Sequence, residues 1–170
     1  IDFRMPTESK AENSKREMFS QHFNRLPQPI NVGDFFSPER VARLREINAE
    51  EAREIFIEMY RAFPFRYPSI FQRVFQELMT QERVVYHCSA GKDRTGITSF
   101  LVLSALGVHR DDILDNFLES NEHAEALHNL FRAARPKEER IDPQLEAFYK
   151  KIRTVDEAYL LAAEREINAA

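Results

Sequence analysis

Residues 84–103, VVYHCSAGKDRTGITSFLVL, join a β-branched apolar run to a polar loop with glycines and then to a second apolar run. The first run, Val84–Tyr86, is typical of a central β-strand. The second, Thr95–Leu106, is apolar on most sides and predicts a buried helix, which Gly107 is well placed to end. A buried strand that passes through a tight loop into a buried helix indicates an α/β domain.

The other expected elements follow from prolines, capping residues and periodicity. Strands are expected at residues 1–4 and 27–32, and helices at 41–63, 70–78, 110–135 and from 141 onward. Ser37 and Pro38 are typical of a helix start. The first long helix is expected to break near Asn48, and the two prolines of FPFRYPSI at residues 63–70 are expected to interrupt the helical run.

Composition limits the classes of function. The chain has 170 residues, 43% of them hydrophobic and 31% charged, with no repeat or linker, which predicts one mainly helical, soluble α/β domain over residues 1–170. The formal net charge of -4 provides no general basic field, so no nucleic-acid partner is expected. No window is long and apolar enough to predict a transmembrane segment.

Cys88 is the single cysteine, which excludes a disulfide within the chain and a cysteine-rich zinc site. The histidines show no metal-ligand spacing, so neither a metal nor another cofactor is expected. One unpaired cysteine favours a reducing compartment, and we expect a cytoplasmic protein. The chain begins at Ile1, inside an expected strand, so an upstream segment is expected to be missing and a secreted or processed form stays open.

The loop between the two apolar runs combines the features of an anion site with a nucleophile. A helix start presents unpaired N–H groups and the positive end of the dipole, and a loop before it aims more N–H groups at one point. Gly91 lets the chain turn, and Gly96 lets the helix pack closely on its neighbours. Cys88 is expected to be a thiolate near neutral pH. Arg94 returns to the same cradle with a planar fork that fits two oxyanion oxygens.

A nucleophile, a ring of N–H donors and a bidentate cation together suit phosphoryl transfer through a covalent thiophosphate. Thr95 could donate its hydroxyl proton to the sulfur and favour the thiolate. The alternative is an inert buried Cys88, which is the common state of a lone cysteine after an apolar strand. The loop residues Gly91, Lys92 and Asp93 favour a reactive site, because such a mixture is hard to explain as packing.

The sequence HCSAGKDRTG resembles the signature loop of the cysteine-dependent protein tyrosine phosphatase superfamily, with His-Cys, five residues, then Arg and Ser or Thr. Its Ala-Gly-Lys-Asp-Arg-Thr-Gly form is similar to the bacterial protein-tyrosine/serine phosphatases, a group with dual-specificity and phosphoinositide-phosphatase-like traits. IDFR, LGVHRDDILDNFLESN and IDPQLEAFYKKI resemble further segments of that group. The resemblance implies an α/β fold with a central, mostly parallel sheet, truncated at its N-terminal side and surrounded by many helices.

The resemblance also implies two-step dephosphorylation of phosphotyrosine proteins, with phosphoserine and phosphothreonine as further substrates. Cys88 would form a phosphocysteine that water hydrolyses, while Arg94 and loop N–H groups hold the phosphate oxygens. The implied phosphate-binding residues are Ser89, Ala90, Gly91, Lys92, Asp93 and Arg94. Inhibitory phosphate or another oxyanion would bind in the same loop. A phosphoinositide phosphatase with the same residues and a phosphate-binding module without turnover are the alternatives.

Four further side chains have expected roles around the loop. Asp93 matches the loop aspartate to which the bacterial group assigns protonation of the leaving oxygen, and the other interpretation is a structural brace. Lys92 either adds charge for multiply phosphorylated substrates or lies solvated at the rim. His87 is expected to hydrogen-bond to the loop backbone and tune the thiol. Asp2 and Arg4 have two interpretations, a place near the pocket or a buried ion pair, and the ion pair is the favoured one.

Overall fold

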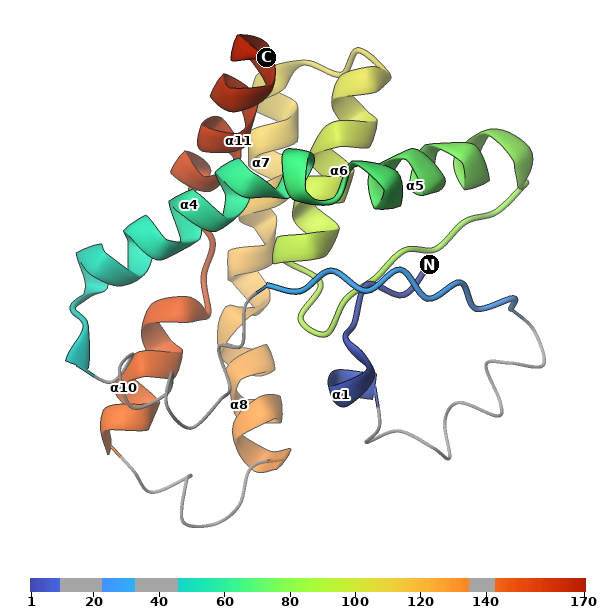
Figure 1. The fold of residues 1–170 in the computed structure, drawn as a ribbon. Helices are drawn as coiled ribbons and strands as arrows, with labels where there is room; N and C mark the ends of the chain where they lie inside the picture. Colours follow the sequence, from blue (N-terminus) through green and yellow to red (C-terminus); the bar gives the residue numbers. More distant parts are fainter. Residues whose placement is uncertain (10–22, 33–45, 135–142) are drawn as a thin grey trace.

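The computed structural model describes residues 1–9, 23–32, 46–134 and 143–170, and Figure 1 shows their arrangement. The helices in these ranges are α1 (Pro6–Ser9), α4 (Ala49–Arg66), α5 (Pro68–Thr80), α6 (Asp93–Ala105), α7 (Arg110–Glu119), the 3₁₀-helix η1 (Ser120–His123), α8 (Ala124–Ala134), α10 (Pro143–Ile152) and α11 (Glu157–Ala169). Helix α11 packs along α4 and also contacts α7, which in turn packs on α6. Extended segments pass beneath this group of helices (Figure 1).

Local sequence signals account for several helix boundaries. Asn48 caps α4 by accepting a hydrogen bond from the Glu51 N–H, while the Glu51 side chain accepts one from Asn48, so the predicted break near Asn48 is confirmed. Helix α4 continues through Pro64, and the expected interruption occurs at Tyr67, just before α5. Gly107 follows α6 with φ 77°, the conformation that suits glycine at a helix end. The expected helix start at Ser37 lies outside the described residues.

The predicted central parallel sheet is wrong for the described part of the chain, which contains no regular β-strand. Instead, Asp2 forms isolated parallel bridges with Pro27 on one side and His87 on the other. The central segment is short because Pro6 begins α1, and prolines 27 and 29 have no N–H to extend the outer ladder. Val84–Tyr86 is extended but is not a regular strand. A β-branched run favours the extended conformation, but it does not supply a neighbouring segment long enough to form a ladder with it.

These three extended segments still hold the loop in place. The Phe3 N–H donates to His87 O at 2.9 Å, and His87 N–H donates to Ile1 O at 3.0 Å. On the opposite side, Gln28 N–H donates to Asp2 O at 2.9 Å. Residues 1–4 therefore fix the end of the segment from which Cys88 emerges.

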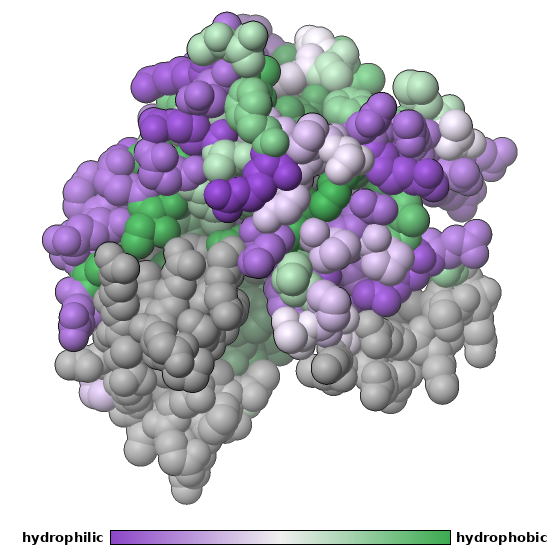
Figure 2. Space-filling model, viewed as in Figure 1, coloured by the Kyte–Doolittle hydropathy of each residue, from purple (hydrophilic) through white to green (hydrophobic). Residues whose placement is uncertain are grey.

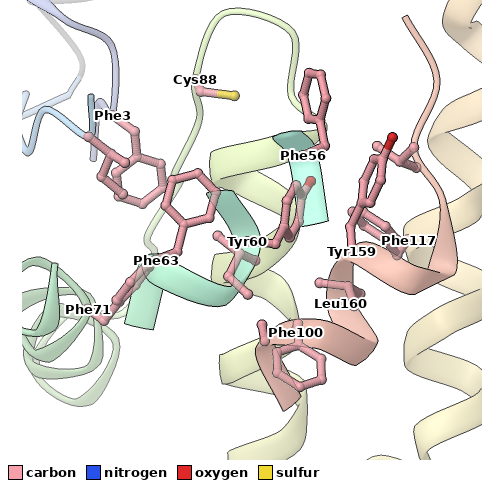
Figure 3. Packing of buried hydrophobic residues seen from close by; sticks show 14 of the residues in the cluster. Phe3, Phe56, Tyr60, Phe63, Phe71, Cys88, Phe100, Phe117, Tyr159 and Leu160 are labelled. Atoms are coloured by element: carbon pink, nitrogen blue, oxygen red, sulfur yellow. The ribbon is translucent and has the colours of Figure 1, made fainter. Parts of the chain in front are cut away.

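The core is an aromatic cluster centred on Tyr60 of α4, which is fully buried (Figure 3). Its ring centroid lies 5.5 Å from that of Phe63, 5.9 Å from that of Phe117 in α7, and 5.2 Å from that of Tyr159 in α11. Such edge-on and tilted contacts add to the free energy of burying the rings. Cys88 lies at the edge of this cluster (Figure 3), so the core supports the loop directly.

On the face of the molecule shown in Figure 2, hydrophilic and hydrophobic residues are interspersed wherever the atoms are coloured. Large exposed apolar side chains come from separate parts of the chain, such as Met79 in α5 and Leu106 just after α6. Within the described residues, no helix combines the length and the apolar character needed to cross a lipid bilayer.

Candidate active site

The loop after the extended segment 83–87 brings the predicted nucleophile to the start of a buried helix. Cys88 is buried, and its sulfur accepts hydrogen bonds from the Gly91 N–H and the Thr95 hydroxyl, each at 3.2 Å. Gly91 has φ 75°, a backbone conformation that favours glycine, whereas a Cβ at this position would meet open space. The backbone conformation, and not a lack of space, therefore explains the glycine. Helix α6 begins at Asp93, two residues earlier than predicted, and includes Arg94 in its first turn.

The loop backbone is suited to an anion. The N–H groups of Ser89, Ala90 and Lys92 have no protein acceptor in the described part of the chain. Ser89 is exposed, whereas Lys92 is buried, so the three donors run from the surface of the loop into the molecule. Unpaired N–H groups before a helix start form the kind of concave nest that binds phosphate.

Arg94 is buried, with 5% of its surface exposed, and its guanidinium is fixed from several directions. Nη1 donates to the Phe3 carbonyl at 3.1 Å and to Glu8 Oε2 at 2.7 Å, and Nη2 donates to Glu8 Oε1 at 2.6 Å. Burial by itself would lower the pKa of Arg94, but its hydrogen bonds to Glu8 and the nearby Cys88 raise that pKa above its ordinary value. The arginine is therefore a permanent cation beside the sulfur.

Glu8 is the site residue that sequence reasoning missed. It lies in α1, within a polar stretch that shows no clear helical pattern in the sequence. It also accepts bonds from Ser89 Oγ at 2.6 Å and from the Met5 N–H at 2.7 Å. The start of α1 could have been predicted from Pro6 with an acidic residue two positions later. An acid at that position accepts a hydrogen bond from the backbone N–H of the residue before the helix, as Glu8 does from Met5. Nothing local in the sequence indicates its pairing with Arg94.

Asp93 and Lys92 form a pair on the core side of the loop. Lys92 Nζ lies 2.9 Å from Asp93 Oδ1 and 2.7 Å from Oδ2, and it sits 5.3 Å from the centroid of the Phe56 ring. The Tyr60 hydroxyl donates to Asp93 Oδ1 at 3.1 Å. Burial, with the charge of Asp93, raises the pKa of Tyr60 well above its usual value, so the hydroxyl stays a donor. Lys92 is buried, which does not fit a solvated lysine at the rim.

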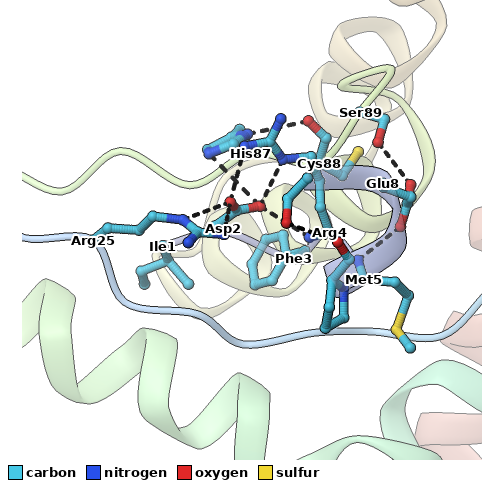
Figure 4. A network of polar contacts seen from close by, with 12 residues as sticks. Ile1, Asp2, Phe3, Arg4, Met5, Glu8, Arg25, His87, Cys88 and Ser89 are labelled. Atoms are coloured by element: carbon cyan, nitrogen blue, oxygen red, sulfur yellow. Dashed lines mark hydrogen bonds and ion pairs between the residues drawn. The ribbon is translucent and has the colours of Figure 1, made fainter. Parts of the chain in front are cut away.

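A second polar cluster supports the other end of the loop (Figure 4). Asp2 is buried and accepts three bonds from Arg4, one from its backbone N–H and two from its guanidinium, at 3.0 Å each. It accepts two more from Arg25, at 2.9 and 2.7 Å, and the expected Asp2–Arg4 ion pair is confirmed. Burial raises the pKa of Asp2, but the bonds from both arginines outweigh it and leave that pKa well below its ordinary value. His87 Nδ1 lies 3.1 Å from the Cys88 carbonyl oxygen, which matches the expected contact with the loop backbone.

Gly96 lies where α6 packs on α7. A Cβ at this position would come within 2.7 Å of Cε2 of Phe117. The absent side chain thus permits the close approach of the two helices that the sequence predicts. The structure brings the predicted loop residues together, and in the described residues no group of three His, Cys, Asp or Glu side chains could hold a metal ion.

Comparisons with known proteins show which family the sequence matches. The model of the tyrosine phosphatase family matches residues 1–170. A Cupriavidus necator protein whose name ascribes tyrosine-protein phosphatase activity to it is 37% identical over 122 residues, which cover 72% of this chain and 44% of that protein. The triple specificity protein phosphatase PtpB of Mycobacterium tuberculosis is 39% identical over 80 residues, which cover 46% of this chain and 29% of that protein. The chain thus spans less than half the length of either relative.

Proposed function

Because the chain belongs to the tyrosine phosphatase family, we propose that it hydrolyses phosphomonoesters, with phosphotyrosine in proteins as the first substrate, through a phosphocysteine intermediate. The observation that carries the proposal is the sulfur of Cys88, held by two donors at a helix start beside the buried Arg94. No other described feature combines a nucleophile with donors for an oxyanion.

The first step transfers the phosphoryl group to the enzyme. The Cys88 sulfur attacks phosphorus, the bond from phosphorus to the ester oxygen breaks, and that oxygen leaves with the electron pair and takes a proton. Arg94 and the loop N–H groups hold the three other oxygens, whose charge they stabilise in the transition state. In the second step water attacks phosphorus, the sulfur–phosphorus bond breaks, and phosphate leaves.

We assign the proton of the first step to Asp93. Its carboxyl follows the loop directly, and Tyr60 and Lys92 fix its position. These contacts suit a structural brace equally well, since a brace needs the same bonds. The two roles differ in their dependence on the leaving group, which provides the test described below.

The intact protein should hydrolyse p-nitrophenyl phosphate in the presence of EDTA. Cys88→Ser should abolish turnover and keep vanadate binding, because the hydroxyl is a much weaker nucleophile but the cradle is intact. Arg94→Ala should lose both turnover and vanadate binding. Turnover by Cys88→Ser at the wild-type rate would rule out the mechanism.

A broader substrate range is the second candidate, because one relative carries the name triple specificity protein phosphatase. Turnover of phosphotyrosine peptides, phosphoserine peptides and phosphoinositides, measured side by side, separates the possibilities. Activity confined to inositol lipids would favour the lipid phosphatase. Vanadate binding without turnover of any substrate would favour a phosphate-binding module.

A further inference from the structure

Glu8 contacts both the loop and the arginine of the proposed active site, although it lies about eighty residues away in sequence. We propose that Glu8 is a positioning residue that turns one edge of the Arg94 guanidinium toward the substrate, an inference that rests on the proposed function. Nothing in the sequence pattern assigns this role to Glu8.

The hydrogen bonds of Arg94 divide its guanidinium into two edges. A guanidinium has five N–H donors: one on Nε and two on each Nη nitrogen. Glu8 accepts from the outer end of the guanidinium, with Oε2 on Nη1 and Oε1 on Nη2. The other hydrogen of Nη1 points to the carbonyls of Phe3, at 3.1 Å, and Ile30, at 3.4 Å. The hydrogen of Nε and the second hydrogen of Nη2 have no acceptor in the described part of the chain. These two lie on one edge, with the spacing of two phosphate oxygens.

Glu8 is itself fixed by the element it belongs to and by the loop. The N–H of Met5, just before α1, donates to Oε2, and Ser89 Oγ donates to Oε1 from the loop (Figure 4). Burial would raise the pKa of Glu8, but its bonds from Arg94, Ser89 and Met5 lower it below the ordinary value, so the carboxylate is ionised at neutral pH. A charged, doubly anchored acceptor is what holds a flexible arginine in one orientation.

The charge of Glu8 has a second consequence. Arg94 is almost completely buried, and a buried cation without a partner is costly. Glu8 compensates this charge from the edge that does not face the phosphate. Substrate and carboxylate can therefore bind the same guanidinium together, so the contact need not open for catalysis.

The test is Glu8→Gln, which keeps the shape and one acceptor and removes the charge. We expect kcat for p-nitrophenyl phosphate to fall about 10- to 100-fold, as misplacement by about 1 Å does, and vanadate to bind more weakly. Glu8→Asp should recover part of the loss, because it restores the charge. Glu58→Gln is the matched control, since Glu58 pairs with Arg61 on the exposed side of α4, and it should behave as wild type.

The outcomes distinguish a positioning role for Glu8 from a purely structural role and from competition with the oxyanion. Wild-type kcat and vanadate affinity in Glu8→Gln, even with a lower melting temperature, would show a structural role and overturn the proposal. Tighter vanadate binding would also overturn it, because it would mean that Glu8 competes with the oxyanion. If Glu8→Gln does not fold, Ser89→Ala removes one anchor of Glu8 and should cause a smaller loss of vanadate affinity, whereas no loss would contradict the inference.

Vanadate binding by calorimetry keeps this test independent of turnover. A wild-type protein that binds vanadate but hydrolyses no ester would contradict the proposed function alone. The comparison of vanadate affinity between wild type and Glu8→Gln would still decide whether Glu8 orients Arg94.

Discussion

Tyr60 joins the aromatic core to the proposed active site through a single hydroxyl group. Its ring fills the centre of the core, and its oxygen donates to Asp93 at 3.1 Å. The ring contributes packing whether or not the oxygen is present, so the two contributions can be separated by removing the oxygen alone. The position of Asp93, at the end of the loop, therefore depends on one side chain of α4, more than thirty residues earlier in the sequence.

Tyr60→Phe should lower the free energy of unfolding by about 1.5 to 3 kcal/mol, the range for hydrogen bonds to charged groups. Urea denaturation measures this loss. Tyr67→Phe is the control, because the Tyr67 hydroxyl donates to the uncharged Asn31 carbonyl at an exposed position. An equal loss in both variants would contradict a special role for the Tyr60–Asp93 bond.

Asp93→Asn tests which role the carboxyl has. If Asp93 supplies the proton, kcat should fall far more for phenyl phosphate than for p-nitrophenyl phosphate, because p-nitrophenolate leaves without protonation. Steady-state kinetics on both esters measure the ratio. Equal loss on the two substrates would leave Asp93 as a brace that holds Lys92 and Tyr60.

At the scale of elements, the proposed site depends on how α6 packs against α7. The loop ends where α6 begins, and the first turn of α6 carries both Asp93 and Arg94. Phe117 of α7 lies against the backbone of α6 at Gly96. Any side chain at this position must displace the ring or move the start of α6.

Gly96→Ala should therefore destabilise the protein by about 1 to 3 kcal/mol, the usual cost of overpacking a core. Thermal and urea unfolding measure the change. Adding Phe117→Leu should make the alanine less harmful than it is in the wild-type background, because the branched side chain lacks the ring edge. Additive effects of the two substitutions would argue against the predicted clash.

At the scale of the whole molecule, Asp2 connects three parts of the chain that are remote in sequence. It pairs with Arg4 next to it and Arg25 of the second segment, and its backbone pairs with the segment that leads to Cys88. The arginines hold the pKa of Asp2 well below its ordinary value of 3.8. A carboxyl with a lowered folded pKa stabilises the fold above its unfolded pKa and loses that contribution as pH falls through the folded value.

The free energy of unfolding should thus decline as pH falls below about 4, and Asp2→Asn should make this decline less steep. Urea denaturation at a series of pH values measures the slope. Asp156→Asn is the control, because Asp156 pairs with Arg53 at a more exposed position, so solvent screens its pair and the slope should change less. An unchanged slope in Asp2→Asn would contradict the ion-pair account.

The loop and the helix boundaries were predictable because their causes are local. The loop and the first helical turn after it contain Cys88, Gly91, Arg94 and Thr95. Their short spacing in the sequence is enough to bring them together. Asn48 and Gly107 act on the backbone beside them. Local contacts of this kind can be predicted without knowing which other segments pack against them.

The sheet was mispredicted because a strand depends on its partners. Val84–Tyr86 has the composition of a strand, but residues 1–4 provide only a short neighbour before Pro6. Extended conformation is a property of the residues themselves, whereas a ladder is a property of two segments.

The sequence by itself was enough to predict which residues form the proposed active-site loop of this tyrosine phosphatase family member, because Cys88, Arg94 and the backbone N–H groups between them are close together in the chain. Only the tertiary structure showed Glu8 on Arg94, Tyr60 on Asp93 and Arg25 on Asp2. The physical reason is that these pairs form between segments that only the packed helices and the short parallel bridges bring together.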